Sequence, residues 1–498
     1  MRSTAVGMVM LNDERKDVWK RNDAENRAIV EAWAALIEKS MKNLDGSTVK
    51  IVKGKTVIHS VRTAQQVGEQ LLKAGCRSII MLYNVWNFPF LVWPFVNCFG
   101  VDTPILSLSN NNGKSPGNVG LLATDGALRQ AGRRTHRIVG EIGDQATQQK
   151  VFAWVRAAQA RTTIKNEVFG LYGGHSMGME TGFFHLTATL KALGTTCYQI
   201  DQLLLTEVMK CVSDDEVKKG LGWFKRLMGQ RIHWDGDMLT EETLSRQIRL
   251  YCAMREVNAE EGFDFCGLKG QRELTEYVCL GDVPEMVMND PYDWNGEKEP
   301  TVCATEADAY AAITMQLMKY LSGGYPTLFM DVRLYHPDKD LWDWCNSGNH
   351  ASYFAAQSLS AKKNFETVSF HPALKYYFKA GGASVEFDAM PGPMTFARLG
   401  LWDEKPYLVI VAGEAVELPA EDRQALNDQT NPTWPHVHAR LDCDFEEFLA
   451  TFPCNHVLGL AGDHVPGLVY LSEMAGIAPV VLGQRGKERV KPIWERVE

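Results

Sequence analysis

The segment VFGLYGGHSMGMETGFFHLTATLKALGTTCYQID, residues 168–201, indicates the fold class. It begins with the apolar run 168–174, which ends in two glycines, and it closes with a second short run, 195–201. Between these runs, residues 182–194 carry apolar side chains at helical spacing and end at Gly194. A strand, a helix and a strand in this order form one unit of a parallel sheet. The segment therefore predicts an α/β layer.

The same alternation continues on both sides of this segment. Apolar runs of strand length alternate with stretches whose apolar residues follow the helical period. We expect strands over 50–59, 78–86, 263–269 and 326–334, and helices over 24–42, 63–75, 202–259 and from Glu306 to about Tyr320.

The sequence changes in character beyond about residue 345. Short β-rich runs separated by Gly and Pro turns dominate there, such as GGASVEFDAM (381–390) and GPMTFARLGLW (392–402). Such runs are typical of an antiparallel barrel or sandwich. We therefore predict two Rossmann-like α/β/α domains, 1–166 and 167–344, followed by a mostly antiparallel β-barrel domain, 345–498.

Composition excludes several classes of protein. The chain has 498 residues, of which 45% are hydrophobic and 23% charged, so it can form a sizeable core. Its formal net charge of −9 and its lack of a basic block argue against a nucleic-acid partner. No apolar stretch is long enough to span a bilayer, which argues against a membrane partner. The 11 scattered cysteines predict reduced thiols, and we expect a cytoplasmic protein.

Gly174-His175-Ser176-Met177-Gly178 has the G-x-S-x-G pattern of a hydrolase nucleophile turn. It lies between a predicted strand and a predicted helix, as such a turn would. A serine hydrolase is therefore one interpretation. The alternative is that the glycines allow a ligand or a neighbouring backbone to approach the strand end closely.

Two pairs of residues have the chemistry of metal ligands. His436 and His438 would share one face of a strand. Glu306 begins a predicted helix and Asp331 ends the apolar run Leu328-Phe329-Met330, and α/β folds place ligands at such positions. Structural interpretations stay open: Thr305 to Asp308 match a capping box, and Asp331 could pair with Arg333.

Several blocks in the same order resemble the L-fucose isomerase and L-arabinose isomerase family, most closely its fucose isomerase branch. The resemblance runs from about residue 78 to 484. The blocks include Asp293-Trp294-Asn295-Gly296, Ala304-Thr305-Glu306, Asp331-Val332-Arg333, Asn346-Ser347-Gly348, Thr433-Trp434-Pro435 and Asn455-His456.

The resemblance implies a divalent metal ion on Glu306, Asp331 and His456. Without it, a core histidine is the simpler interpretation of His456. The family's usual ion is Mn²⁺, with Mg²⁺ and Co²⁺ as alternatives, and mixed carboxylate and imidazole ligands suit it. The family also gives Glu306 and Asp331 the acid and base roles. The implied reaction converts an aldose into a ketose through an enediol, whose negative charge a metal ion stabilises.

The resemblance further implies substrate contacts, which are Arg15, Trp86, Met177, Lys269, Trp434 and Asn455. Trp86 would reach the site of a neighbouring subunit, since the family forms hexamers. The chain departs from the family at two positions: Lys269 replaces a Gln, and Ala383 replaces a Tyr. A lysine facing the sugar suggests an anionic substrate, unless a carboxylate pairs with it.

We therefore expect a metal-dependent isomerase of a free, unphosphorylated aldose such as L-fucose or D-arabinose. The alternatives are an isomerase of an anionic or other hexose, and a serine hydrolase acting through Ser176.

Overall fold

The computed structural model describes residues 4–112, 115–348 and 350–483, and the chain divides into two compact units. Unit 1 comprises residues 1–163, 320–323 and 466–476, and unit 2 comprises the rest. The predicted division into 1–166, 167–344 and 345–498 stays a prediction, and its last residues, 484–498, lie outside the described part.

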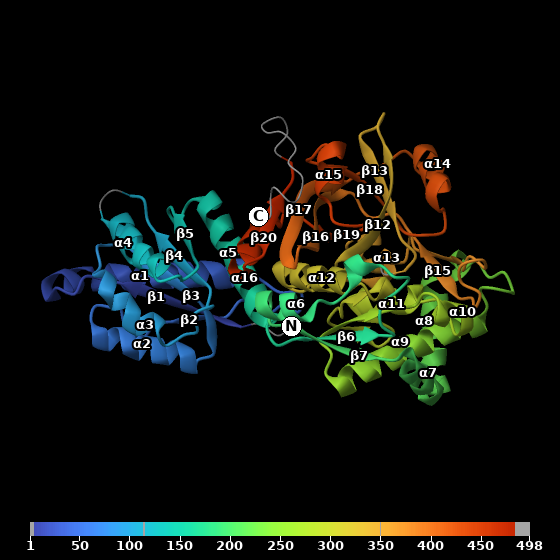
Figure 1. Ribbon diagram of the computed structural model, residues 1–498, viewed down its shortest axis with the longest axis horizontal. Coiled ribbons are helices and arrows are strands. Elements are labelled where there is room, and N and C mark those ends of the chain that lie inside the picture. The colour runs from blue at the N-terminus through green and yellow to red at the C-terminus, as the bar shows by residue number, and fades with distance from the viewer. Residues whose placement is uncertain (1–3, 113–114, 349, 484–498) are drawn as a thin grey trace. The chain divides into compact units, whose positions relative to one another are not determined.

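Unit 1 contains a five-stranded parallel sheet with the order β2-β1-β3-β4-β5 (Figure 1). Val9 of β1 and Met81 of β3 belong to one apolar cluster with Leu71 of α2 and Phe95 of α3. This sheet confirms that the first part of the chain is α/β. Its elements are β1 (Ala5–Leu11), α1 (Lys16–Ser40), β2 (Ile51–Lys53), α2 (Val61–Lys73), β3 (Cys76–Tyr83), α3 (Val92–Val96), β4 (Ile105–Ser109), α4 (Gly117–Gln130), β5 (Thr135–Val139) and α5 (Gln145–Thr163); most of α16 (Val465–Ala475) also belongs to this unit.

Unit 2 contains a second parallel sheet, in the order β11-β8-β6-β7. Its strands are β6 (Val168–Tyr172), β7 (Thr196–Ile200), β8 (Phe265–Leu268) and β11 (Cys303–Ala304). Because the strands are parallel, the segments that follow β6, β8 and β11 leave the sheet at one edge. The helices are α6 (Leu186–Ala192), α7 (Gln202–Cys211), α8 (Asp214–Met228), α9 (Glu241–Glu261), α10 (Glu273–Tyr277), α11 (Asp282–Asn289) and most of α12 (Ala309–Ser322).

A seven-stranded sheet completes unit 2, in the order β16-β19-β12-β13-β18-β17-β20. All its pairings are antiparallel except that between β17 and β20, and β16 also pairs with β17. The antiparallel strands were predicted, whereas a closed barrel stays a prediction. The strands are β12 (Leu328–His336), β13 (Leu341–Cys345), β16 (Gly392–Trp402), β17 (Lys405–Ala415), β18 (His436–Leu441), β19 (His456–Ala461) and β20 (Ala478–Val481).

Shorter elements surround these sheets. They are two small hairpins and three helices, namely β9 (Tyr292–Asp293) with β10 (Gly296–Glu297), β14 (Ser369–Pro372) with β15 (Ala383–Glu386), α13 (Ala361–Asn364), α14 (Ala420–Thr430) and α15 (Phe445–Thr451).

Strand β12 has different neighbours from those expected. We placed residues 326–334 in the second α/β domain, but β12 pairs with β13 and β19 of the seven-stranded sheet. An apolar run fits a buried parallel strand and a buried antiparallel strand equally well, so its partners are set by distant residues. Asp331 therefore lies within a strand rather than at a strand end.

Candidate active site

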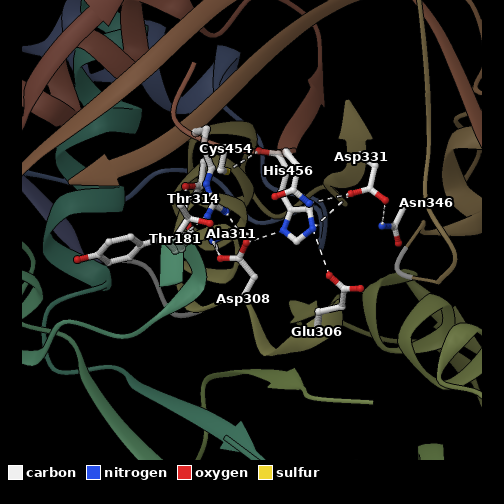
Figure 2. A network of polar contacts seen from close by, with 12 residues as sticks. Thr181, Glu306, Asp308, Ala311, Thr314, Asp331, Asn346, Cys454 and His456 are labelled. Atoms are coloured by element: carbon white, nitrogen blue, oxygen red, sulfur yellow. Dashed lines mark hydrogen bonds and ion pairs between the residues drawn. The ribbon is translucent and has the colours of Figure 1, made fainter. Parts of the chain in front are cut away.

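Glu306, Asp331 and His456 lie together in unit 2 (Figure 2). The Nε2 atom of His456 is 3.2 Å from Oε2 of Glu306 and 3.3 Å from Oδ1 of Asp331. The imidazole is buried, whereas the Glu306 and Asp331 side chains keep 18% and 19% of their surface exposed. Two accessible carboxylates therefore meet one buried ring nitrogen.

Strand register brings two of these residues together. Asp331 on β12 is the direct partner of His456 on β19. Opposing residues of an antiparallel pair lie on the same face of the sheet, with their Cβ atoms about 5 Å apart. The closeness of Asp331 and His456 is thus a consequence of backbone pairing.

Glu306 lies in a turn that L-residues rarely adopt. Its φ is +55° and that of Ala307 is +53°. This left-handed conformation costs about 1–2 kcal/mol per residue, and it is often found at functional sites. Gly267 of β8 leaves room for the turn, because a Cβ there would lie 3.0 Å from Cα of Ala307.

The helix that follows starts later than predicted. We expected it to begin at Glu306 with Thr305 as its cap, but α12 begins at Ala309. The side chain of Asp308 caps it, since the amide of Ala311 donates to Oδ1 of Asp308 at 2.9 Å. Two left-handed residues cannot form a helical turn, so the helix begins only after them.

Neighbouring charges stabilise the ionised forms of Asp331 and His456. Burial alone would raise the pKa of Asp331, but the adjacent His456 ring holds that pKa below its ordinary value. Burial alone would lower the pKa of His456, but Asp308, Asp331 and Glu306 raise it well above its ordinary value. Protonation of Nε2 therefore competes with the binding of a metal ion to that nitrogen.

The three side chains fit a divalent metal ion. Nε2 of His456 is buried and has no hydrogen-bond partner of normal geometry in the described part of the chain, although two carboxylates are close. The other ring nitrogen, Nδ1, is 2.6 Å from Oδ2 of Asp308, which leaves Nε2 to face the carboxylates. Oxygen and imidazole ligands of this kind suit Mn²⁺ and similar ions.

A second group of metal-binding types is Asp343, His436 and His438, whose ligand atoms lie within 4.8 Å of one another. The two histidines share a face of β18, as predicted, with ring centroids 5.8 Å apart. However, Nδ1 of His436 lies 2.7 Å from Asp343, and Nε2 lies 2.7 Å from the carbonyl oxygen of Asn431. Burial would lower the pKa of His436, but Asp343 raises it. Both ring nitrogens of His436 are thus occupied, but Nε2 of His438 is buried with no hydrogen-bond partner in the described part of the chain, so this group stays a possible metal site.

The carboxylates of Glu306 and Asp331 border a pocket in unit 2. Its wall contains two predicted sugar contacts, Lys269 and Trp434. The Lys269 ammonium donates to Oε2 of Glu273 at 2.7 Å. The guanidinium of Arg333 lies 5.0 Å from the centre of the Trp434 ring, which is itself largely buried.

Asn455, another predicted contact, reaches Asp331 directly. Its amide donates to Oδ1 of Asp331 at 3.2 Å, and Asn346 donates to Oδ2 at 2.9 Å. Met177 is exposed, has a φ of +48°, and is not among the residues that line this pocket.

Arg15 and Trp86 belong to unit 1. Phe88 links them, because its ring centroid is 5.9 Å from the Arg15 guanidinium and 6.3 Å from the Trp86 ring. Arg15 also forms an ion pair with Asp13 at 2.6 Å.

Several pocket residues were not predicted as site residues. These are Gln271, Asp282, Glu285, Arg333, Asn346, Ser347 and Tyr377. Burial raises the pKa of Asp282 to about 7 and that of Glu285 well above its ordinary value. Sequence offered a signal for some of them, since Arg333, Asn346 and Ser347 stand in blocks that carry the family resemblance.

The hydrolase interpretation of Ser176 is wrong. Ser176 is buried, and its hydroxyl donates to the carbonyl oxygen of Gln271 at 3.4 Å. No histidine is among its hydrogen-bond partners in the described residues, and α6 begins only at Leu186. The glycines instead have positive φ, as in a tight turn after β6.

Among the described helices, none is both long and apolar enough to cross a bilayer.

The chain matches three family models along its length. They describe the first N-terminal domain of L-fucose isomerase (residues 3–166), its second N-terminal domain (254–323) and its C-terminal domain (344–482). The L-fucose isomerase of Bacteroides thetaiotaomicron is 27% identical over 486 residues, which cover 82% of this chain and 80% of that protein. The L-fucose isomerase of Vibrio vulnificus is 24% identical over 526 residues, covering 90% and 88%.

Proposed function

We propose that this chain, which belongs to the L-fucose isomerase family and is an aldose–ketose isomerase, uses a divalent metal ion held by Glu306, Asp331 and His456. Its proposed substrate is a free, unphosphorylated aldose such as L-fucose or D-arabinose. The supporting observation is the position of the buried Nε2 of His456, within 3.2 Å and 3.3 Å of two carboxylates.

Isomerisation moves a proton from C2 to C1 of the open-chain sugar and another from O2 to O1. A Mn²⁺ ion held by Glu306, Asp331 and His456 would stabilise the negative charge that develops on the sugar between these two states. Glu306 and Asp331 both border the pocket, so one carboxylate can accept the C2 proton while the other supports the transfer between oxygens.

The neighbours of Asp331 keep its carboxylate ionised and in a fixed orientation. Amides of Asn346 and Asn455 each donate to one of its oxygens, and His456 lowers its pKa. An acid that stays ionised can bind a cation and accept a proton at neutral pH. The two asparagines also fix the plane of the carboxylate, which orients it toward a bound sugar.

The pocket favours a neutral sugar over an anionic one. Lys269 suggested an anionic substrate, but its ammonium is already paired with Glu273. An anionic group would have to displace that carboxylate or bind beside it, and like charges oppose this. Lys269 can still donate to a sugar hydroxyl, and the Trp434 ring in the pocket wall suits the apolar C–H side of a sugar.

Arg15, Trp86 and Met177 are proposed as contacts of the complete site in a hexamer. The clustering of Arg15 and Trp86 on Phe88 supports a common task for these two residues. We also propose a cytoplasmic location, consistent with 11 free cysteines in the described residues.

Metal removal tests the proposal. We expect EDTA treatment to abolish isomerisation and Mn²⁺ to restore it, with bound metal measured by mass spectrometry. His456→Asn should lose both the metal and the activity. His438→Gln is the matched control, because it removes a buried histidine of the other cluster whose ring lies 3.8 Å and 3.9 Å from its acidic neighbours. Retention of metal by His456→Asn would overturn the assignment, and loss of metal in His438→Gln alone would place the ion at the other cluster.

A further inference from the structure

Asp308, which no sequence motif assigned to the site, is surrounded by hydrogen-bond donors. Oδ2 lies 2.6 Å from Nδ1 of His456 and 2.9 Å from Nη1 of Arg398. Oδ1 accepts from Nη2 of Arg398 at 3.0 Å and from the amide of Ala311 at 2.9 Å. Both oxygens are thus fully engaged, and the carboxylate cannot rotate without losing contacts.

Arg398 is fully buried and connects the Asp308 carboxylate to the loop that contains Thr181. Its Nη2 atom also donates to the carbonyl oxygen of Thr181 at 3.0 Å. The next residue, Gly182, packs directly on Asp308, because a Cβ there would lie 3.3 Å from Cα of Asp308. Thr181 and Gly182 close the loop 175–183, which carries Met177.

We infer that Asp308 and Arg398 are positioning residues that orient Nε2 of His456 toward Glu306 and Asp331 and anchor the Met177 loop to the same buried ion pair. This inference rests on the proposed function, since it treats His456 as a metal ligand. A carboxylate that accepts from Nδ1–H of a histidine fixes both the ring orientation and the tautomer that ligates through Nε2.

Fold stability alone does not account for this arrangement. The Arg398 and Asp308 side chains are each 1% exposed, and both lose their hydration on folding. Apolar residues of similar volume usually stabilise a core as well as a buried ion pair, or better. The donors around Asp308 come from the metal-binding histidine, the start of α12 and β16, so the pair holds separate elements in one geometry.

Metal affinity tests the histidine end of the pair. Asp308→Asn keeps the size of the side chain, but its NH₂ group must face a donor, so either His456 or Arg398 loses its partner. We expect Mn²⁺ binding, measured by calorimetry on metal-free protein, to weaken about 10- to 100-fold. Asp293→Asn is the matched control, because Asp293 is also buried and accepts from Tyr251 at 2.7 Å and Arg255 at 3.2 Å. The control should bind Mn²⁺ as the original protein does.

Hydrogen exchange tests the loop end. Arg398→Lys keeps the charge but cannot reach both oxygens of Asp308 and the Thr181 carbonyl at once. We expect the amides of residues 175–183 to exchange at least tenfold faster in the metal-free variant than in the metal-free original protein, whereas exchange in unit 1 should be the same in both. Unchanged exchange there would overturn the anchoring of the loop.

The outcomes separate this inference from the function on which it rests. If His456→Asn binds Mn²⁺ as tightly as the original protein, the proposed metal site fails and the inference with it. If His456→Asn loses Mn²⁺ while Asp308→Asn retains the original affinity, the metal site stands and the positioning role is overturned. Equal weakening in Asp308→Asn and Asp293→Asn also overturns it, since general destabilisation would then explain the loss.

Discussion

A single methyl group added at Gly267 should disturb the active site through the strained turn. In Gly267→Ala, the new Cβ would lie 2.9 Å from Cζ of Phe169, 3.0 Å from Cα of Ala307 and 3.4 Å from the Ala307 carbonyl carbon. Real carbon atoms seldom come this close, so either the Phe169 ring or the Ala307 backbone has to move. Ala307 directly follows Glu306, and both are left-handed.

The size of the effect follows from which neighbour moves. Overpacking a core typically costs about 1–3 kcal/mol. Phe169 is fully buried and its ring lies 5.2 Å from that of Phe265, so it has little room to tilt. If the backbone of Ala307 takes up the shift, Glu306 moves relative to His456. A loss of about 1.4–3 kcal/mol in transition-state stabilisation corresponds to roughly 10- to 100-fold in kcat/KM.

Ketose formation and thermal unfolding should be measured together. Gly170→Ala is the matched control, because Gly170 lies on β6, the strand that pairs with β8, and a Cβ there would overlap the Phe263 ring. The control should lower the unfolding temperature without changing kcat/KM for the folded enzyme. A Gly267→Ala protein with a lowered unfolding temperature and unchanged kcat/KM would refute the reasoning, because the Phe169 ring rather than the Ala307 backbone would then have moved.

Three further predictions concern strain, burial and charge at this site. Ala307→Gly should raise the free energy of unfolding by about 1 kcal/mol, because glycine adopts a φ of +53° without strain; calorimetry showing no gain would contradict this. Burial raises the pKa of Asp282 from 3.8 to about 7. The neutral acid therefore contributes stability that is complete below pH 3.8 and is lost as pH rises through 7, and the free energy of unfolding falls by about 4 kcal/mol over this range. Asp282→Asn should therefore flatten the fall in unfolding temperature between pH 5 and 8, and an unchanged slope would show that Asp282 ionises without cost. Glu273→Gln should free the Lys269 ammonium and raise the kcat/KM ratio of a uronic acid to its neutral aldose at least threefold; an unchanged ratio would mean that Lys269 does not face the sugar.

Local patterns in the sequence predicted elements better than their pairing. The run 168–174 corresponds to β6 at Val168–Tyr172, and the run 263–269 to β8 at Phe265–Leu268. Both are short apolar segments bounded by turn residues, a signal that is complete within the segment. The partners of β12 depend on β13 and on β19, which lies more than a hundred residues away, so no local pattern could specify them.

The site was predictable only in part for the same reason. Residue chemistry singled out Glu306 and Asp331, whereas His456 looked like a core histidine until the family resemblance assigned it. Asp308 looked like part of a helix cap, which it is, and that role concealed its contact with His456. Arg398, a charge within the apolar run TFARLGL, did carry a signal, because a buried cation requires a buried partner.

Three energetically costly features lie at or beside one pocket, and their coincidence is an argument for a ligand there. Glu306 and Ala307 have left-handed backbones, Arg398 and Asp308 form a fully buried ion pair, and burial raises the pKa of Asp282. Each feature works against folding stability. The Asp308–Arg398 ion pair lies beside the strained turn, and Asp282 lines the pocket that Glu306 borders. A sequence selected for stability alone would avoid all three, since apolar residues and a regular helix start would fill the same space. Their presence together is explained if the geometry of Glu306, Asp331 and His456 is what the surrounding residues maintain.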